Sequence, residues 1–522
     1  MKKIFLSQII ISLFLCCFII YPLVVLISNI KIGDIVNLII SKQFLPMLMN
    51  SLIIGLVSTI LSVSLALLFA WCIQRTNIKH KTLFSLLFTI PMLIPTISHG
   101  MGLALLWGDN GILTNLLGIN IHIYGFCGMI IGFVLYSFPI AFLLISDIFQ
   151  YEDYTLYEAA EVLGLSKMQQ FLKITLQNLK KPIISAFFAV FTMVFTDYGI
   201  PLAIGGKILT LSSYMYREVI GLLNFSTGAF LGSLLLIPAV VAFLFDLKFK
   251  EGVSNTVSKP YVIKVNKKRD YITYVLIFLM VLFILLPIAT FALLSIVNQY
   301  PLNFSISLKH FATAFNLGIG KYCINSITIA LLTSLVGSVI IYYTAFITAK
   351  SKKTFSVAML HLISLLSLAI PGIVLGLSYT LAFKGSPIYG GLAIIVLVNL
   401  IHFFSSPYLM AYNSLNQLNT NLEDVRTVLG ISKLRMIIDV YIPNTQETLI
   451  EMFAYLFVNA MVTISAVSFL ANYKVMPVAL LIPQFDAQSM IEVTSIISLL
   501  ILCINGILKF LVYLVKQKYV FK

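Results

Sequence analysis

Long uninterrupted apolar runs recur along the whole chain, and they restrict its possible folds more than any other feature. Hydrophobic residues make up 60% of the 522 residues, and charged residues only 10%. A water-soluble domain needs many polar side chains to cover its core. Many of the runs also exceed the roughly 18 apolar residues that are typical of a membrane-spanning helix. The sequence therefore predicts an all-α polytopic protein embedded in a lipid bilayer.

The apolar runs predict about twelve spanning helices. They fall at roughly 4–30, 47–73, 83–108, 124–148, 183–206, 227–246, 271–297, 322–349, 356–383, 391–413, 448–472 and 490–515, with boundaries uncertain by a few residues. The first run is too long for the apolar part of a signal peptide, so we interpret it as the first span.

The basic residues are distributed unevenly between the two ends of these predicted spans. The formal net charge is +15. In a polytopic membrane protein, lysine and arginine gather in cytoplasmic loops and set the orientation, so nucleic acid is not predicted as a partner. With a cytoplasmic N-terminus, the bias towards the cytoplasmic side is about threefold. The sequence thus predicts a multi-pass protein of the cell (plasma or inner) membrane with both termini in the cytoplasm.

The two halves of the chain resemble each other. An even number of spans in each half makes them parallel repeats related by an axis along the membrane normal. We expect a first six-span unit at 1–250, a cytoplasmic linker at 251–270 and a second six-span unit at 271–522. The matching segments are MNSLIIGLVSTILS (49–62) with INSITIALLTSLVG (324–337), LIPTISHGMGL (93–103) with AIPGIVLGLSY (369–379), and SFPIAF (137–142) with SSPYLM (405–410).

One polar segment outside the bilayer is also present twice. YEAAEVLGLSKMQQFLKITLQNLKKP (157–182) and EDVRTVLGISKLRMIIDVYIPNTQE (423–447) follow the fourth predicted span of each half. The pattern predicts a short helix, a turn at Gly164 or Gly430, and a second short helix, because glycine permits the positive φ of a helix C-cap. The alternative is an ordinary amphipathic interfacial helix. Two aligned copies at matching positions favour a shared docking function.

This segment resembles the EAA loop of binding-protein-dependent ABC importer permeases. The first copy matches the pattern at Glu158, Ala159, Ala160, Gly164, Ile174 and Leu176, with Gln177 where the family usually has proline. The second copy keeps Gly430, Val440, Ile442 and Pro443, but carries Asp424, Val425 and Arg426 in place of Glu-Ala-Ala. The resemblance implies that each loop is a coupling helix held in a groove of an ATPase subunit.

The same resemblance implies a type I-like ABC importer permease fold and a set of partners. These would be two copies of an ATPase subunit on the cytoplasmic side and an extracellular or periplasmic solute-binding protein. ATP and magnesium would be used by the ATPase subunits, and no cofactor would be bound by this chain. The implied coupling residues are Glu158, Ala159, Ala160, Gly164, Leu165, Asp424, Val425, Gly430 and Ile431.

No pattern for catalysis is present. The chain has no Walker A sequence, no paired carboxylates and no metal-ligand spacing, which predicts a transport subunit rather than an enzyme. Polar groups within spans are costly, so they are candidates for a substrate path. Asp197 and Tyr198 in the fifth predicted span and His99 in the third are the tentative choices. For Asp197 and His99, the alternative is a structural role within the helix bundle.

The substrate is predicted less directly. A single chain with two permease units resembles the iron(III), thiamine and 2-aminoethylphosphonate branch of these importers. Residues 89–118, 195–226 and 458–470 look most like the 2-aminoethylphosphonate type, so a phosphonate is the first expectation, with iron(III) and thiamine as alternatives. A different class, an ion-coupled secondary transporter, would require charged relays within several spans, and very few such charges are present.

Overall fold

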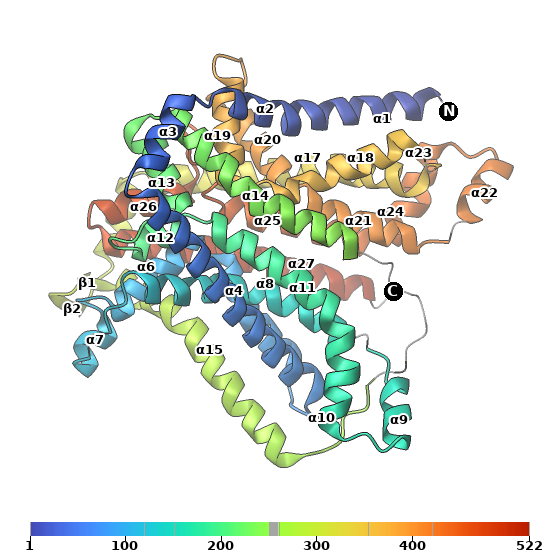
Figure 1. The fold of residues 1–522 in the computed structure, drawn as a ribbon, viewed down its shortest axis with the longest axis horizontal. Helices are drawn as coiled ribbons and strands as arrows, with labels where there is room; N and C mark the ends of the chain where they lie inside the picture. The colour runs from blue at the N-terminus through green and yellow to red at the C-terminus, as the bar shows by residue number, and fades with distance from the viewer. Residues whose placement is uncertain are drawn as a thin grey trace. The chain divides into compact units, whose positions relative to one another are not determined.

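The computed structural model describes residues 2–119, 121–150, 152–249, 259, 261–352, 354–419 and 421–520, nearly all of which are helical or in short connections (Figure 1). Part of the predicted linker, residues 251–258 and residue 260, lies outside the described residues. The prediction of an all-α polytopic chain is confirmed. The described residues contain a single two-stranded sheet, the antiparallel pair β1 (Val297–Gln299) and β2 (Asn303–Ile306).

The helices of the first half of the chain are as follows. They are α1 (Lys2–Leu15), η1 (Cys16–Ile20), α2 (Tyr21–Ser28), α3 (Ile32–Ile40), α4 (Phe44–Arg75), α5 (Lys81–Thr89), η2 (Ile90–Leu93), α6 (Thr96–Trp107), α7 (Ile112–Leu117), α8 (Phe126–Gln150), α9 (Thr155–Val162), α10 (Lys167–Gln170), η3 (Phe171–Thr175), α11 (Leu176–Thr196), α12 (Gly199–Ile204), α13 (Leu211–Tyr216), η4 (Arg217–Gly221) and α14 (Phe225–Phe249).

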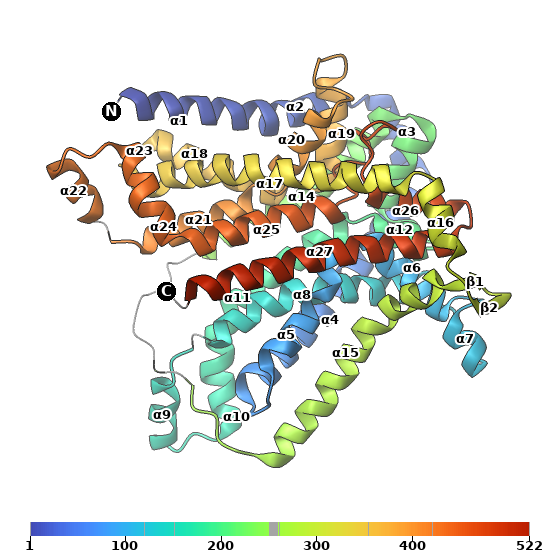
Figure 2. The same ribbon diagram turned by 180° about the vertical axis from the view of Figure 1, so that it is seen from behind.

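The second half repeats much of this order. Its helices are α15 (Lys267–Ser295), α16 (Lys309–Asn316), α17 (Ile319–Lys350), α18 (Phe355–Leu365), η5 (Leu366–Ala369), α19 (Gly372–Phe383), α20 (Leu392–His402), α21 (Ser405–Gln417), α22 (Asn421–Val428), α23 (Lys433–Met436), η6 (Ile437–Tyr441), α24 (Ile442–Asn444), α25 (Gln446–Val462), η7 (Val478–Leu480), α26 (Leu481–Ala487) and α27 (Ile491–Val520). Figure 2 shows α17, α25 and α27 running side by side.

Eight helices of the described chain are long and apolar enough to cross a membrane, and three bent helix pairs raise the number to as many as eleven. The predicted span at 448–472 is the segment that falls short. Its helix, α25, has 17 residues and ends at Thr463, whose extended backbone (ψ 131°) stops the helix. The first half has the same break, because α11 ends at Asp197 with ψ 136°. The break at the C-terminal end is thus part of the repeat, whereas α25 is shorter because it also begins anew after Thr445.

The bent helix pairs also repeat between the halves. Lys81–Leu93 and Thr96–Leu117 meet at 99°, and Phe355–Ala369 and Gly372–Phe383 meet at 109°. Pro95 and Pro371 stand at the two bends, with φ of −60° in both cases and extended ψ values of 150° and 142°. Proline cannot continue a helix from the preceding turn, so it separates the two arms of each pair.

A matched pair of asparagine and serine side chains fixes each half in the same way. Ser51 Oγ accepts a hydrogen bond from Leu211 N at 2.8 Å, and Ser326 Oγ accepts one from Val478 N at 2.7 Å. Asn50 donates to Leu209 O at 3.1 Å, and Asn325 donates to Lys474 O at 3.0 Å. These side chains hold backbone segments that lie about 150 residues further along the chain, and this is a structural role.

The chain folds into two compact units that exchange segments of sequence. One unit contains Met1–Leu38, Met215–Leu236 and Lys309–Lys522, and the other contains Ile39–Tyr214 and Ile237–Leu308. Within the first unit, Tyr379 Oη of α19 donates to Phe18 O of η1 at 2.8 Å. Within the second unit, Lys79 N, between α4 and α5, donates to Tyr274 Oη of α15 at 2.7 Å. The first span of each sequence half therefore packs in the unit built mainly from the other half, and the boundaries 1–250, 251–270 and 271–522 stay a prediction about the sequence repeat.

Candidate functional site

In the first duplicated loop, α9 is followed by a hydrogen-bonded turn at Gly164. The glycine has φ +70°. Gly164 N donates to Glu161 O at 3.0 Å, and Leu165 N donates to Ala160 O at 3.0 Å. These two bonds define a Schellman motif, in which a left-handed residue lets the chain turn back over the last carbonyls of a helix. Glycine meets this requirement without the steric cost of a Cβ.

The second loop has the same turn at Gly430, after α22. Its φ is +64°. Gly430 N donates to Thr427 O at 3.4 Å, and Ile431 N donates to Arg426 O at 3.1 Å. The loss of the Glu-Ala-Ala sequence has therefore left the backbone geometry intact. Asp424 belongs to α22, but its side chain lies outside the described residues.

Each turn leads into a new helix through a serine cap. Ser166 Oγ accepts from Gln169 N at 3.3 Å while Ser166 N donates to Gln169 Oε1 at 2.9 Å, which is a capping box. Ser432 Oγ accepts from Arg435 N at 3.3 Å in the second copy. The expectation of a separate second short helix is wrong for the first loop. There α10, η3 and α11 form one run, Lys167–Thr196, so the loop is joined rigidly to a membrane span.

The tips of both loops expose apolar side chains. Val162 and Leu163 are 88% and 77% exposed, and the equivalent Val428 and Leu429 are 85% and 65% exposed. Apolar groups repeated at one turn and left in water indicate an interaction surface. The sequence reasoning missed Val162 and Val428, although their identity at matching positions directly before each turn was a usable signal. The predicted contact Leu165 is half-buried instead.

The first loop is held to its unit by a buried polar cluster. Tyr157, which is 5% exposed, donates its hydroxyl to Glu152 Oε1 at 2.6 Å and shares a 2.6 Å hydrogen bond with Thr175 Oγ1. Glu152 also forms an ion pair with Arg75 at the end of α4, and both side chains are buried. Burial raises the pKa of the Tyr157 hydroxyl above its usual range, so the hydroxyl remains a donor at neutral pH. Ala160 is buried, whereas Ala159 is exposed.

The segment formed by residue 259 and residues 261–266, called the strap below, runs along the first loop. Lys259 O accepts from Tyr154 N at 3.0 Å, and Lys259 N donates to Asp153 Oδ1 at 3.1 Å. The Lys259 ammonium is paired with Glu158, the glutamate of the Glu-Ala-Ala sequence, and both side chains are about half exposed. The Glu158 carboxylate therefore has an ion-pair partner within the chain.

The strap also places an aromatic ring over the buried cluster. The Tyr261 ring lies 5.2 Å from the ring of Tyr154 and 5.1 Å from that of Tyr157, edge to face in both cases. The Arg75 guanidinium lies 3.7 Å from the centre of the Tyr261 ring. Such contacts are stronger when they are shielded from water. The strap thus closes the cluster that anchors the first loop.

We expect Tyr261→Ala to loosen the first loop by about 2 kcal/mol, because it removes two aromatic contacts and one cation–π contact. Faster hydrogen exchange at the amides of residues 157–165 would show this. Arg435→Ala breaks only the exposed Arg435–Asp439 ion pair of the second loop and should leave exchange at residues 157–165 unchanged. Equal exchange in Tyr261→Ala and the wild type would contradict an anchoring role for the strap.

A basic residue anchors the second loop in a simpler way. Lys350 at the end of α17 donates to Leu418 O at 3.1 Å and lies 5.6 Å from the centre of the Tyr441 ring. The hydroxyl of Tyr342 hydrogen-bonds Thr445 Oγ1 at 2.8 Å. Arg75 and Lys350 thus occupy equivalent helix ends, and each ties its loop to the longest helix of its unit.

Asp197 and Tyr198, which we expect in a substrate path, are both buried within their unit. Asp197 is buried, and its Oδ2 accepts from Ile200 N at 3.1 Å, so the carboxylate caps the short helix α12. Ser212 Oγ donates to Asp197 O at 2.7 Å. The equivalent break in the second half carries Thr463. The neighbouring Tyr198 is fully buried. A role in a substrate path stays a prediction for both residues.

His99 lies on α6, which packs closely against α12. A Cβ at Gly100 would lie 2.8 Å from Ala203 Cβ, so glycine is needed for this approach. His99 is 3% exposed, and its Nε2 has no hydrogen-bond partner among the described residues. His99 and Asp197 thus belong to two packed elements of one unit. No group of three or more His, Cys, Asp or Glu side chains in the described chain comes together as a metal site.

A family model, "Binding-protein-dependent transport system inner membrane component", matches residues 62–250 and again 337–520. The chain belongs to this family. The match identifies the chain as a multi-pass inner-membrane component of a binding-protein-dependent transport system. The match to each half separately agrees with the repeated bends, caps and turns described above.

Curated relatives extend over most of the chain. It is 27% identical to the putative ferric transport system permease protein FbpB 1 of Haemophilus influenzae, over 90% of this chain and 78% of that protein. It is 28% identical to the ferric transport system permease protein FbpB of Actinobacillus pleuropneumoniae, over 84% of this chain and 65% of that protein. A solved bacterial alginate ABC transporter, in complex with an alginate pentasaccharide-bound periplasmic protein, aligns with 48% of this chain and 91% of its own at TM-score 0.38 and 17% identity.

Proposed function

We propose that this chain is the permease subunit of an ATP-driven importer, and that one ATPase subunit docks on each of the two loops. The observation that carries the proposal is the matched pair of turns at Gly164 and Gly430, each preceded by two exposed apolar residues. ATPase subunits that act on both halves need an equivalent docking surface on each half. The continuous helical run Lys167–Thr196 would transmit movement of the first loop into the membrane.

Iron(III) is the substrate that we propose. The support is the similarity to two relatives whose names describe ferric transport. Neither relative supports the expectation of a 2-aminoethylphosphonate permease, which rested on three short stretches of sequence. The iron would be cargo, delivered by an external solute-binding protein and released on the side of the loops, which we propose is the cytoplasmic side.

The substrate is tested with the solute-binding protein that cooperates with this permease. We expect the purified binding protein to bind iron(III) at least 100-fold more tightly than 2-aminoethylphosphonate or thiamine, measured by calorimetric titration. Addition of the loaded protein to proteoliposomes that contain the permease and its ATPase should then produce uptake of radioactive iron. Tight binding of the phosphonate or of thiamine, without binding of iron, would overturn the assignment.

The same proteoliposomes distinguish an ATP-driven importer from an ion-coupled transporter. Uptake should require ATP on the loop side and should continue after an ionophore has collapsed all ion gradients. Uptake that persists without ATP and stops with the ionophore would favour a secondary transporter.

A further inference from the structure

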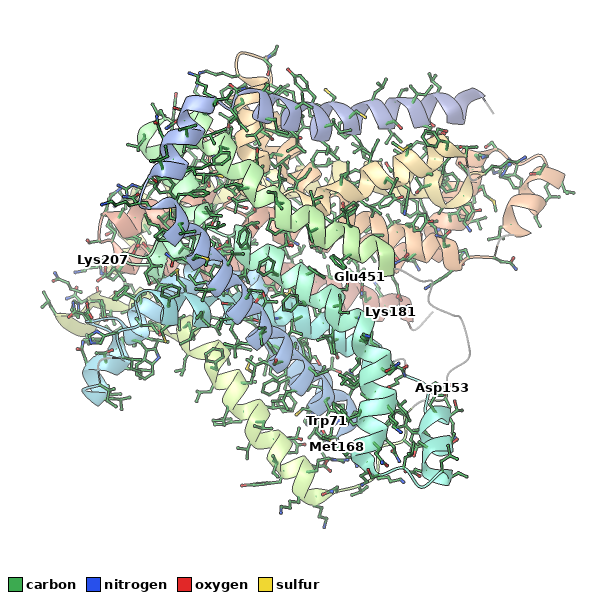
Figure 3. All side chains as sticks on the ribbon, in the orientation of Figure 1. Trp71, Asp153, Met168, Lys181, Lys207 and Glu451 are labelled. Carbon is green, nitrogen blue, oxygen red and sulfur yellow. The ribbon has the colours of Figure 1, made fainter. Side chains whose placement is uncertain are left out.

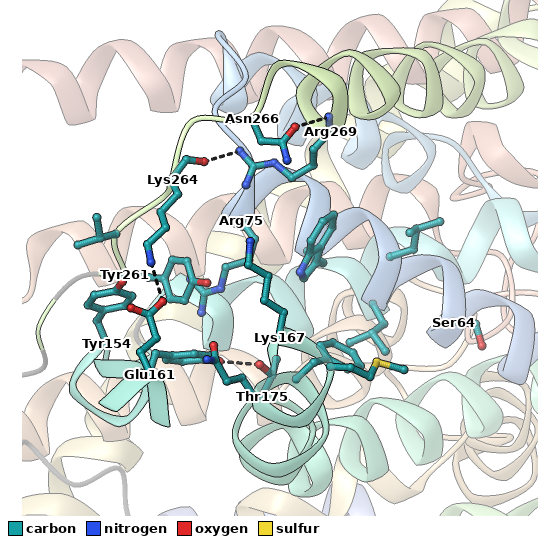
Figure 4. Close-up of a pocket in the computed structure, with 18 residues that line it drawn as sticks. Ser64, Arg75, Tyr154, Glu161, Lys167, Thr175, Tyr261, Lys264, Asn266 and Arg269 are labelled. Carbon is teal, nitrogen blue, oxygen red and sulfur yellow. Dashed lines mark hydrogen bonds and ion pairs between the residues drawn. The ribbon is translucent and has the colours of Figure 1, made fainter. Parts of the chain in front are cut away.

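A cavity of about 720 Å³ lies between the end of α4, the helix α10 and the strap (Figure 4). All its lining residues belong to one compact unit. Figure 3 shows Trp71 of α4 and Met168 of α10 close together at the foot of this unit, whereas Lys207 lies at its opposite end. Because the apolar helix α4 ends at Arg75, the cavity lies at the end of this candidate span, on the side of the first loop.

One end of the cavity is basic. Four cationic side chains and one carboxylate line it, namely Arg75, Lys167, Lys264, Arg269 and Glu161. Arg75 is paired with Glu152, Lys264 with Glu161 at 2.6 Å, and Arg269 with Asp270 at 2.7 Å. Lys167 is exposed at the start of α10 and forms no ion pair in the described chain. When Glu152 and Asp270 are included, four cations face three carboxylates, and the remaining positive charge at Lys167 suits an anion.

The other end of the cavity is apolar and follows α4 into the span. Leu67, Leu68 and Trp71 line it from α4, and Phe171 lines it from η3. Figure 4 shows Ser64 far along α4 from Arg75. The eleven helical steps from Ser64 to Arg75 cover about 16 Å of helix. This length is close to half of a hydrocarbon core of about 30 Å, which is the depth of one leaflet.

We propose that this cavity binds an anionic phospholipid of the leaflet on the loop side. The phosphate would lie between Lys167, Arg269 and Lys264, and one acyl chain would extend along Leu68 and Trp71. A basic pocket between spanning helices on the cytoplasmic side suits such a headgroup. A soluble phosphate would account for the basic end alone, whereas a lipid also accounts for the apolar end and for its partly exposed rim at Ser64 and Leu68.

The bound lipid would connect the strap to the first loop. Lys264 and Arg269 come from the strap and the start of α15, and Lys167 comes from the helix that follows Gly164. A phosphate held between them would carry the charge opposite to that of all three side chains. The lipid would therefore strengthen the attachment of the strap, and with it the anchoring of the first loop.

The two tryptophans of the chain, Trp71 and Trp107, permit a direct test. In the variant Trp107→Phe, fluorescence reports on Trp71 alone. The protein is reconstituted into vesicles with dibrominated phosphatidylglycerol or dibrominated phosphatidylcholine, because a brominated acyl chain quenches tryptophan on contact. We expect the anionic lipid to quench Trp71 at about fivefold lower mole fraction than the zwitterionic lipid, as one favourable lysine contact implies.

Lys167→Glu, added to this variant, should remove the preference for the anionic lipid. A glutamate in the first turn of α10 is compatible with the helix dipole, so the fold is retained. Lys433→Glu at the equivalent position of the second loop is the matched control and should leave the preference unchanged. In the Trp107→Phe variant, which retains Lys167, equal quenching by both lipids or no quenching by either lipid would overturn the proposal. A preference that survives Lys167→Glu would overturn the proposed headgroup position.

Discussion

Gly164→Val is expected to reduce ATP-driven uptake about tenfold or more while leaving the amount of protein in the membrane unchanged. The reason is the backbone, because Gly164 has φ +70° and no atom lies within 4 Å of the place that a Cβ would occupy. A valine at this site therefore meets no neighbour, but it is strained by about 1–3 kcal/mol in the left-handed region. The strain opens the Schellman turn and displaces Val162 and Leu163, the residues that we propose to contact the ATPase.

The measurement is uptake together with substrate-stimulated ATP hydrolysis in proteoliposomes. Gly430→Val tests the second loop in the same way, because it too has open space and a φ of +64°. Gly506→Ala, on α27 with open space around it, is the control and should transport normally. If both valine variants pump at the wild-type rate, the turns do not couple ATP hydrolysis to transport.

The two loops need not contribute equally. The first carries the complete Glu-Ala-Ala sequence and is fastened by the strap, and it continues directly into a span. The second is joined to α25 through the break at Thr445. A stiffer connection transmits displacement with less loss, so we expect the Gly164 variant to be the more severely impaired.

The turns were predictable from the sequence because they depend on local rules. A helix that ends at glycine, followed by serine and a new helix, requires only neighbouring residues to be recognised. Duplication then supplied independent support for both turns. The bends at Pro95 and Pro371 were not predicted, because each lies inside an apolar run that was interpreted as one span.

The anchoring of the first loop was not predictable in this way. Arg75 and Glu152 are 77 residues apart, and the strap meets α9 after a gap of about 100 residues. Charged residues in predicted loops are normally solvated, so nothing local indicated that Arg75 would be buried. The exchange of first spans between the units escaped prediction for a related reason, because hydropathy shows which segments enter the membrane but not which ones pack together.

The second large effect is expected from Arg75→Met. This substitution leaves the Glu152 carboxylate, 3% exposed, without its counter-charge. Breaking a buried ion pair from one side typically costs about 3–5 kcal/mol, because an uncompensated charge remains in a dry environment. We therefore expect a clearly lower Tm in detergent and rapid proteolysis between Tyr154 and Ser166.

The double variant Arg75→Met with Glu152→Gln discriminates between loss of packing and loss of charge compensation. If the buried charge is the cause, the double variant is more stable than Arg75→Met alone, and the coupling energy of the cycle is large. Lys350→Met in the second unit is the matched control. Its ammonium contacts the neutral Leu418 carbonyl and the Tyr441 ring, so its removal should cost only about 1 kcal/mol. Equal losses of stability at Arg75 and Lys350 would mean that the ion pair does not set the stability of the first loop.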